Sequence, residues 1–378
     1  MKNLTRRDFL KTASVATLAA AAKRSLATTA APHRQRIFIA SGTANGILAS
    51  DWNPATGELA PAWGASGFHN VDWITFSPDR KFIYAAAELD NFLNKPAGGV
   101  IRFRVENGQL HPVEAKNSAS VGTCHVAVDH TGNVALSADY GGGSAASFLL
   151  SSGGLTPVWK EHYTGHGPNA DRQRSAHAHF ASFSPDNRFA YINDLGEDCI
   201  HIYSLNAATA MLTAAGSYRA KPGSGPRTLH FHPNGHTAYS INELDSTVDV
   251  LEWSKTDGGL TLLTRINLLP ADYTGDTHAC DTVIAKDGKT VYFANRGNNS
   301  IYLYHADEKS GGLTPGGRFD CGGKTPRSFL LDPTERWMLV ANQDSNQVSV
   351  FARNPVTGEL AKEGKSFAAA TPMCILFA

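Results

Sequence analysis

A short unit recurs along the chain, and this repeat restricts the possible folds more than any other feature of the sequence. Each copy reads as an apolar strand, a polar turn and a second apolar strand, followed by further strand-like segments. The turns of six copies lie at Pro78, His130, Pro185, Pro233, Lys286 and Pro333. A repeat of about 50 residues built from short strands is typical of a β-propeller, with one four-stranded blade per repeat. No long segment with the 3.6-residue period of a helix competes, so we predict an all-β fold.

The two ends of the chain supply a seventh blade. The segment RIFIASGTANGILASDWN from Arg36 resembles the later strands of a repeat, but no first strand precedes it. A strand of the missing kind occurs at the C-terminus, in TPMCILFA from Thr371. Pairing these strands in one blade would close the ring and remove two sheet edges. We therefore predict a seven-bladed β-propeller over residues 32–378, with four-stranded blades and with N- and C-terminal strands sharing one blade.

Residues 1–31 have the layout of an export signal. The pair Arg6-Arg7 precedes Phe9-Leu10-Lys11, an apolar alanine-rich core and a stretch of small residues. Twin arginines in this setting are typical of a Tat signal peptide. We expect cleavage between Ala27 and His33, the Tat export machinery as a partner, and a periplasmic or secreted protein. The alternative is a short N-terminal helix of the folded domain.

The remaining composition excludes several classes of function. Lys+Arg and Asp+Glu both number 34, and this balance gives no sign of binding to nucleic acid or to an anionic membrane. Beyond the signal, no apolar run approaches the length of a membrane span. The five cysteines are odd in number and form no CxxC motif, so we expect buried unpaired thiols, although one disulfide stays open. We expect a monomer that binds a small molecule.

The repeat places two sets of side chains at one end of the innermost hairpins. Residues six before and ten after each turn position should lie together, because the two strands are antiparallel. The first-strand column holds Asp72, Cys124, His179, Arg227, Cys280 and Arg327; the second-strand column holds Glu88, Tyr140, Leu195, Glu243, Arg296 and Gln343. Buried charges are costly unless they are paired or used, so this mouth of the propeller is a candidate site. The alternative is that these groups form ion pairs between blades.

Several of these segments resemble a known family. GPRTLHFHPNGHTAYSINELDSTV, SAHAHFASFSPDNRFAYINDLGEDCIHIY, YFANRGNNSIYLY and GKTPRSFLLDPTERWMLVANQDSNQVSVF are similar to the lactonase family of seven-bladed propellers. That family includes one type of 6-phosphogluconolactonase and the fungal carboxy-muconate lactonizing enzymes. The resemblance spans Gln35 to Ala378 and implies a site with a histidine, two arginines and a glutamate on one rim.

Carried over by motif, the resemblance implies His179, Arg227, Glu243 and Arg296 as catalytic residues. His177 is the alternative to His179, which we prefer because it is in register with Arg227. Around the same mouth we expect substrate-binding roles for His177, Arg327, Gln343, Glu88 and Tyr140.

Opening a lactone requires an activated water, stabilisation of an oxyanion and a proton for the leaving alkoxide. Arginines suit the oxyanion and a substrate carboxylate, and Glu243 or a histidine can move the proton. No cofactor or metal is required, although the column Asp139, Asp194, Asn242, Asn295 and Asn342 could bind Ca²⁺ instead of capping strand ends. Export favours an unphosphorylated sugar-acid or related carboxylated lactone. The alternatives are a muconate-type lactonizing cycloisomerase and a non-catalytic propeller that binds a ligand or protein on its rim.

Overall fold

The structure is a computed structural model, and it describes residues 34–66, 68–151 and 154–378. The predicted Tat signal and its cleavage region lie outside the described residues. Residues Gln35–Ala378 form one compact unit.

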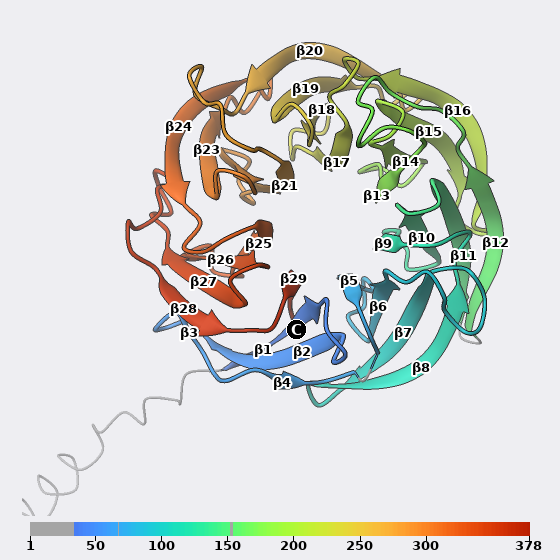
Figure 1. The fold of residues 1–378 in the computed structure, drawn as a ribbon, viewed down its shortest axis with the longest axis horizontal. Helices are drawn as coiled ribbons and strands as arrows, with labels where there is room; N and C mark the ends of the chain where they lie inside the picture. The colour runs from blue at the N-terminus through green and yellow to red at the C-terminus, as the bar shows by residue number, and fades with distance from the viewer. Residues whose placement is uncertain (1–33, 67, 152–153) are drawn as a thin grey trace, which may run out of the picture. The chain divides into compact units, whose positions relative to one another are not determined.

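Seven antiparallel sheets surround a common axis, as Figure 1 shows, and this confirms the predicted propeller. The innermost strands are β5 (Val71–Phe76), β9 (Thr123–Val128), β13 (Ala178–Phe183), β17 (Pro226–Phe231), β21 (Ala279–Ile284), β25 (Pro326–Leu331) and β29 (Pro372–Phe377). The second strands are β6 (Phe82–Ala87), β10 (Val134–Asp139), β14 (Phe189–Asp194), β18 (Thr237–Asn242), β22 (Thr290–Asn295), β26 (Trp337–Asn342) and β1 (Gln35–Ser41).

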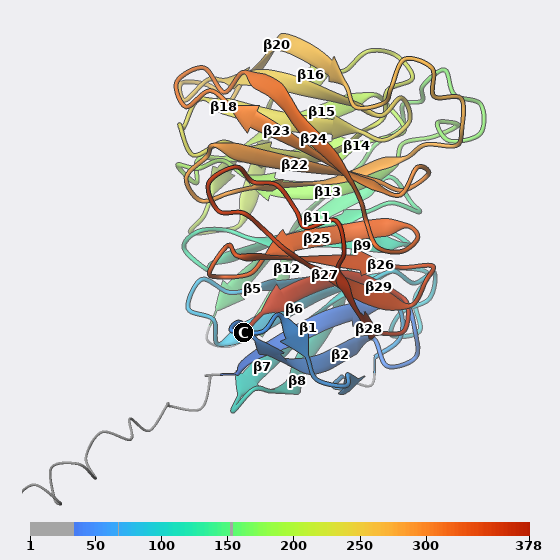
Figure 2. The same ribbon diagram turned by 90° about the vertical axis from the view of Figure 1, so that its left-hand side faces the viewer.

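The outer half of each blade completes the sheet. The third strands are β7 (Gly99–Glu106), β11 (Ser144–Ser151), β15 (Cys199–Asn206), β19 (Thr247–Trp253), β23 (Ser300–Ala306), β27 (Gln347–Ala352) and β2 (Ile47–Asn53). The outermost strands are β8 (Gln109–Asn117), β12 (Gly154–His162), β16 (Met211–Arg219), β20 (Leu260–Asn267), β24 (Leu313–Asp320), β28 (Lys365–Ala368), β3 (Glu58–Leu59) and β4 (Trp63–Gly64). Seen from the side, the connections between strands gather on two opposite faces of the ring (Figure 2).

The terminal blade joins the two ends of the described chain. Strand β29 pairs with β1, with Phe38 opposite Leu376, and β1 pairs with β2. The sharing of this blade by N- and C-terminal strands is therefore confirmed. Its outer edge differs slightly from the other blades, because two short strands, β3 and β4, both pair with β2 in place of one outermost strand.

The core lies between neighbouring blades. Second strands such as β14, β18 and β22 are buried along their whole length, since both of their faces are covered by adjacent sheets. One interblade cluster includes Tyr239, Ile241, Val291 and Phe293, all with exposures of 0%. Truncating an aromatic core residue such as Phe293 to alanine typically costs about 3 to 5 kcal/mol. This packing fixes the blades, and with them the ends of the strands that face the axis.

All five cysteines are buried and unpaired, which confirms the expectation of free thiols. In the described part of the chain, no helix has the length and apolar character needed to cross a membrane.

Every innermost strand carries a β-bulge at the same point. In β17, Pro226 faces Asn242 and Thr228 faces Ile241, so Arg227 has no partner on the neighbouring strand. The equivalent unpaired residues are Asp72, Cys124, His179, Cys280, Arg327 and Met373. A bulge redirects the side chain of the extra residue. The fold thus turns one residue of each blade toward the axis, and six of these seven residues are the first-strand column.

Candidate active site

The bulge residues form the wall of a small central cavity. All seven line it, together with a second layer that includes Trp73, His125, Phe180 and Asp281. The cavity has a volume of about 20 Å³, which is enough for about one water molecule but not for a sugar lactone. A ligand of that size must therefore bind above this ring, at the mouth.

Three aromatic rings also line the cavity. The ring of His125 lies 4.7 Å from that of Trp73 and 4.0 Å from that of Phe180, measured between centroids. Burial holds the pKa of His125 well below its ordinary value, with smaller effects from His230 and Arg227. Uncharged rings thus line the cavity beneath the mouth.

The second-strand column meets the first at this mouth. The backbone N–H of Glu243 donates to the carbonyl of Gly225 at 2.8 Å, and Arg296 makes the matching bond to His278 at 3.0 Å. Leu195 makes the same bond to His177 at 3.0 Å. These bonds close each hairpin, so the residues of both columns lie at one end of the propeller.

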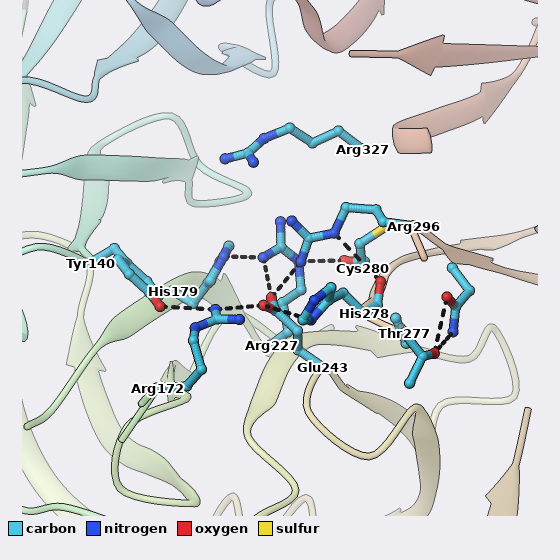
Figure 3. Close-up of polar contacts among 12 residues, drawn as sticks. Tyr140, Arg172, His179, Arg227, Glu243, Thr277, His278, Cys280, Arg296 and Arg327 are labelled. Carbon is cyan, nitrogen blue, oxygen red and sulfur yellow. Dashed lines mark hydrogen bonds and ion pairs between the residues drawn. The ribbon is translucent and has the colours of Figure 1, made fainter. Parts of the chain in front are cut away.

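Glu243 is the centre of a charged group that combines two neighbouring blades and one connecting segment. Its carboxylate contacts Arg227 at 2.6 Å, Arg172 at 2.6 Å and Arg296 at 2.8 Å (Figure 3). The side chain is only 1% exposed. Burial alone would raise the pKa of Glu243, but the surrounding Arg296, Arg227 and Arg172 hold this pKa well below its ordinary value. Glu243 is therefore a permanent anion that orients guanidinium groups.

His179 lies against this group as a neutral imidazole. Its Nε2 atom accepts a hydrogen bond from Arg227, because a guanidinium can only donate. The ring proton therefore sits on Nδ1, which is buried and finds no partner among the described residues. Burial, followed by the charge of Arg227, keeps the pKa of His179 well below its ordinary value. This confirms that His179 lies in register with Arg227, while its catalytic role stays a prediction.

His177 and Tyr140 form a flat wall beside the group. Their rings are stacked, with centroids 4.5 Å apart, and Nδ1 of His177 donates to the carbonyl oxygen of Tyr140 at 2.8 Å. The hydroxyl of Tyr140 accepts a hydrogen bond from Arg172 at 3.1 Å. Both predicted binding residues are therefore linked to Glu243 through Arg172.

Arg172 is a site residue that the sequence reasoning missed. It lies in the segment 163–177 between β12 and β13, whereas the corresponding connection between β16 and β17 covers only 220–225. The neighbouring Gln173 is fully buried and donates to the carbonyl of Leu195 and to Asp198, both at 2.8 Å. The unusual length of this arginine-containing connection was the available signal.

His278 was also missed. Its Nδ1 atom lies 4.0 Å from the Glu243 carboxylate, and its Nε2 atom lies 3.2 Å from Asp276. His278 occupies the position equivalent to His177 in the hairpin that ends in Arg296. Reading the repeat two residues before the first-strand column would have found it.

A second charged group occupies another part of the mouth. Arg327 pairs with Asp72 at 2.8 Å and donates to Gln343 at 3.5 Å. In Figure 3, Arg327 lies apart from the residues that contact Glu243. Burial, then the charge of Asp72, raises the pKa of the nearby Glu88 to about 7. The structure thus divides the charged predicted residues into two groups, whereas Leu195 is apolar and fully buried.

The oxygen-bearing column that could have bound Ca²⁺ instead closes strand ends. Asp139 accepts a hydrogen bond from the backbone N–H of Ser120 at 3.0 Å, Asp194 accepts one from that of His177 at 2.8 Å, and Asn342 donates to the carbonyl of Cys321 at 2.9 Å. These side-chain to backbone contacts are those of the capping interpretation. Among the described residues, one group has the spacing of metal ligands, and it consists of Glu197, Cys199 and His201 at a third strand rather than at the mouth.

Arginines, histidines and the buried Glu243 thus lie at one mouth of a seven-bladed β-propeller. Residues 36–377 match the family Lactonase, 7-bladed beta-propeller, and the chain belongs to this family. The predicted resemblance and fold are thereby confirmed.

Relatives cover nearly the whole propeller. The chain is 29% identical over 340 residues to a 6-phosphogluconolactonase of Bacillus subtilis, covering 89% of this chain and 95% of that one. It is 30% identical to a 6-phosphogluconolactonase of Formosa agariphila, covering 84% and 91%. The solved structure of a periplasmic gluconolactonase from Pseudomonas aeruginosa superimposes with a TM-score of 0.86 at 27% identity, covering 91% of this chain and 99% of that one. These likenesses group the chain with lactone hydrolases.

Proposed function

We propose that this protein is a hydrolase that opens a sugar-acid or related carboxylated lactone at the mouth around Glu243. The observation that carries the proposal is the convergence of Arg172, Arg227 and Arg296 on one buried carboxylate. Each guanidinium has five N–H donors, so donors remain for a ligand after the contacts with Glu243. The names of the similar proteins support the same reaction class.

The arginines would act on the charge that develops during hydrolysis. A water molecule attacks the carbonyl carbon, the new C–O bond forms, and the carbonyl oxygen becomes an oxyanion. Arg172 and Arg296, with side chains 34% and 16% exposed, can donate to this oxyanion or to a substrate carboxylate. The ring C–O bond then breaks, and the leaving alkoxide takes a proton. Glu243 holds the donors in place before the substrate arrives.

We further propose that residues 1–31 are a Tat signal and that the mature protein, residues 32–378, works in the periplasm or outside the cell. The twin arginines Arg6 and Arg7 support this, and a similar protein from Pseudomonas aeruginosa is described as periplasmic. Phosphorylated sugar lactones are cytoplasmic metabolites. An exported enzyme would therefore act on an unphosphorylated lactone.

A hydrolysis screen tests the proposal. The purified mature protein is assayed on glucono-δ-lactone, its 6-phosphate and other carboxylated lactones, after subtraction of spontaneous hydrolysis. We expect turnover of the unphosphorylated lactone, with the same rate after treatment with a chelator. Binding without turnover would support a ligand-binding propeller, and conversion of muconates alone would support a lactonizing enzyme.

A further inference from the structure

Hydrolysis needs a group that takes a proton from water, and the two acid–base residues that directly contact Arg227, namely Glu243 and His179, are unsuited to this. Both carboxylate oxygens of Glu243 contact guanidinium groups at 2.6 to 2.8 Å, and the side chain is almost completely buried. The Nε2 lone pair of His179 is occupied by Arg227. Protonating either residue would break contacts that hold the arginines.

Glu88 occupies the second-strand column in another blade, directly after β6. Its side chain is half-buried at the mouth, and among the described residues its carboxylate makes no hydrogen bond. The charged groups that act on it are Asp72 of β5, Arg327 of β25, Arg227 of β17 and Asp90 in the following segment. Arg327 is already paired with Asp72. Glu88 is therefore a carboxyl group with a free proton-accepting oxygen.

We propose that Glu88 is the residue that exchanges protons with the attacking water and with the leaving alkoxide. This inference rests on the proposed lactone hydrolysis. The Glu88 carboxylate takes a proton as the water oxygen bonds to the carbonyl carbon. The resulting carboxyl group gives that proton to the ring oxygen as the ring C–O bond breaks, which restores the carboxylate and leaves the opened hydroxy acid.

His177 is the competing candidate, because its Nε2 atom makes no hydrogen bond among the described residues. Its surroundings argue against it. The adjacent Tyr140 is bound to Arg172, and a protonated His177 would add a positive charge to the side of the mouth that already holds the arginines. A protonated Glu88 is neutral and relieves its repulsion with Asp72 and Asp90. Proton uptake is thus favoured at Glu88, beside Asp72 and Asp90, whereas oxyanion binding is favoured beside Arg172 and Arg296.

The environment of Glu88 suits this exchange. Burial is the largest cause that raises the pKa of Glu88 to about 7, and Asp72 adds to it. A base with a pKa near the working pH exchanges protons most effectively. Because the carboxylate form is required, kcat/KM should fall as the pH drops through about 7.

The experiment compares pH profiles of glucono-δ-lactone hydrolysis for the wild type, Glu88→Gln and His177→Asn. We expect Glu88→Gln to lower kcat by about 100-fold or more with little change in KM, and to abolish the decline below pH 7. Glu88→Asp should retain a decline at acid pH with a reduced rate. Glu106→Gln, which changes an exposed glutamate on the outer part of the same blade, should leave the profile unchanged.

The outcomes separate the two proposals. No turnover by the wild type would overturn both. The role of Glu88 alone would be overturned if Glu88→Gln kept the decline in rate below pH 7, which we call the acid limb. It would also be overturned if His177→Asn were the only variant to lose this acid limb. The wild type gives a further measurement that needs no variant. The midpoint of a carboxyl group changes little with temperature, whereas an imidazole midpoint that falls on warming would contradict the proposal.

Discussion

Two glutamates occupy equivalent positions at the mouth, yet their surroundings differ in the ratio of positive to negative charge. Glu243 is one carboxylate among Arg172, Arg227 and Arg296. Glu88 lies near a second carboxylate, that of Asp72. The guanidinium of Arg327 is already paired with Asp72. The pKa of Glu243 is accordingly held well below its ordinary value, whereas that of Glu88 is raised to about 7.

This difference shows that a position in the repeat does not decide the chemistry of a residue. The hairpin brings both glutamates to one end of the propeller through the same backbone bonds. Their acidity is then decided by partners on the same hairpin, on other blades and in connecting segments. Substitutions that change these partners one at a time should therefore affect the two glutamates differently.

The largest effect is expected for Glu243→Gln. It removes the only carboxylate that contacts Arg172, Arg227 and Arg296 among the described residues. Removing one member of a buried charge pair typically costs about 3 to 5 kcal/mol. We expect this loss in urea denaturation, and a fall in kcat/KM of about 1000-fold because the oxyanion donors lose their orientation. A variant of wild-type stability would show that Glu243 does not hold the arginines.

Arg172→Ala should have an intermediate effect. Glu243 keeps two guanidinium partners, but one exposed donor to the ligand is lost. We expect kcat/KM to fall by about 10- to 100-fold, because a hydrogen bond to a charged group contributes about 1.5 to 3 kcal/mol.

The matched control is Arg174→Ala, since Arg174 lies on the same segment but is 78% exposed. Its contacts are an ion pair with the exposed Asp171 at 3.8 Å and a hydrogen bond to the carbonyl of Ala170, and neither reaches Glu243. Equal losses in both variants would indicate a general disturbance of segment 163–177 instead of a role for Arg172.

Asp72→Asn should shift the pH profile more than the rate. The substitution removes a negative charge that raises the pKa of Glu88 and frees Arg327, whose charge lowers it. Both changes favour the Glu88 carboxylate, so the midpoint of the acid limb should move below its wild-type value of about 7. An upward shift of the midpoint in kcat/KM profiles would contradict this explanation of the raised pKa of Glu88.

The smallest effect is expected for the stability of Glu88→Gln. The folded protein keeps a proton on Glu88 up to a pH of about 7, whereas the unfolded chain releases it near 4.5. The contribution of Glu88 to stability therefore declines as the pH rises between these values. We expect Glu88→Gln to have a slightly higher Tm than the wild type at pH 8 and no advantage at pH 4. Glu243→Gln should lower Tm at pH 8, so the same substitution has opposite signs at two equivalent positions.

Much of this architecture could be predicted because positions were counted from a recurring turn. Counting from Pro233 placed Arg227 and Glu243 together, and the same count placed His179 and Arg296 beside them. The β-bulge could not be predicted, because it depends on which residues of two strands face each other. Arg172 lies in an irregular segment that has no equivalent position in the repeat, so counting from the turns could not place it at the site.

The closing pairing has a consequence for how the protein folds. Met373 on β29 completes the ring of bulge residues, and a neighbouring contact joins Ser41 to the carbonyl of Ala370 across 329 positions of the chain. Contacts between such distant residues form slowly, because a long loop must close first. The wall beneath the mouth therefore stays incomplete until the slowest contact of the fold has formed. A partly folded chain would carry all of its charged site residues but no closed surface to hold a ligand.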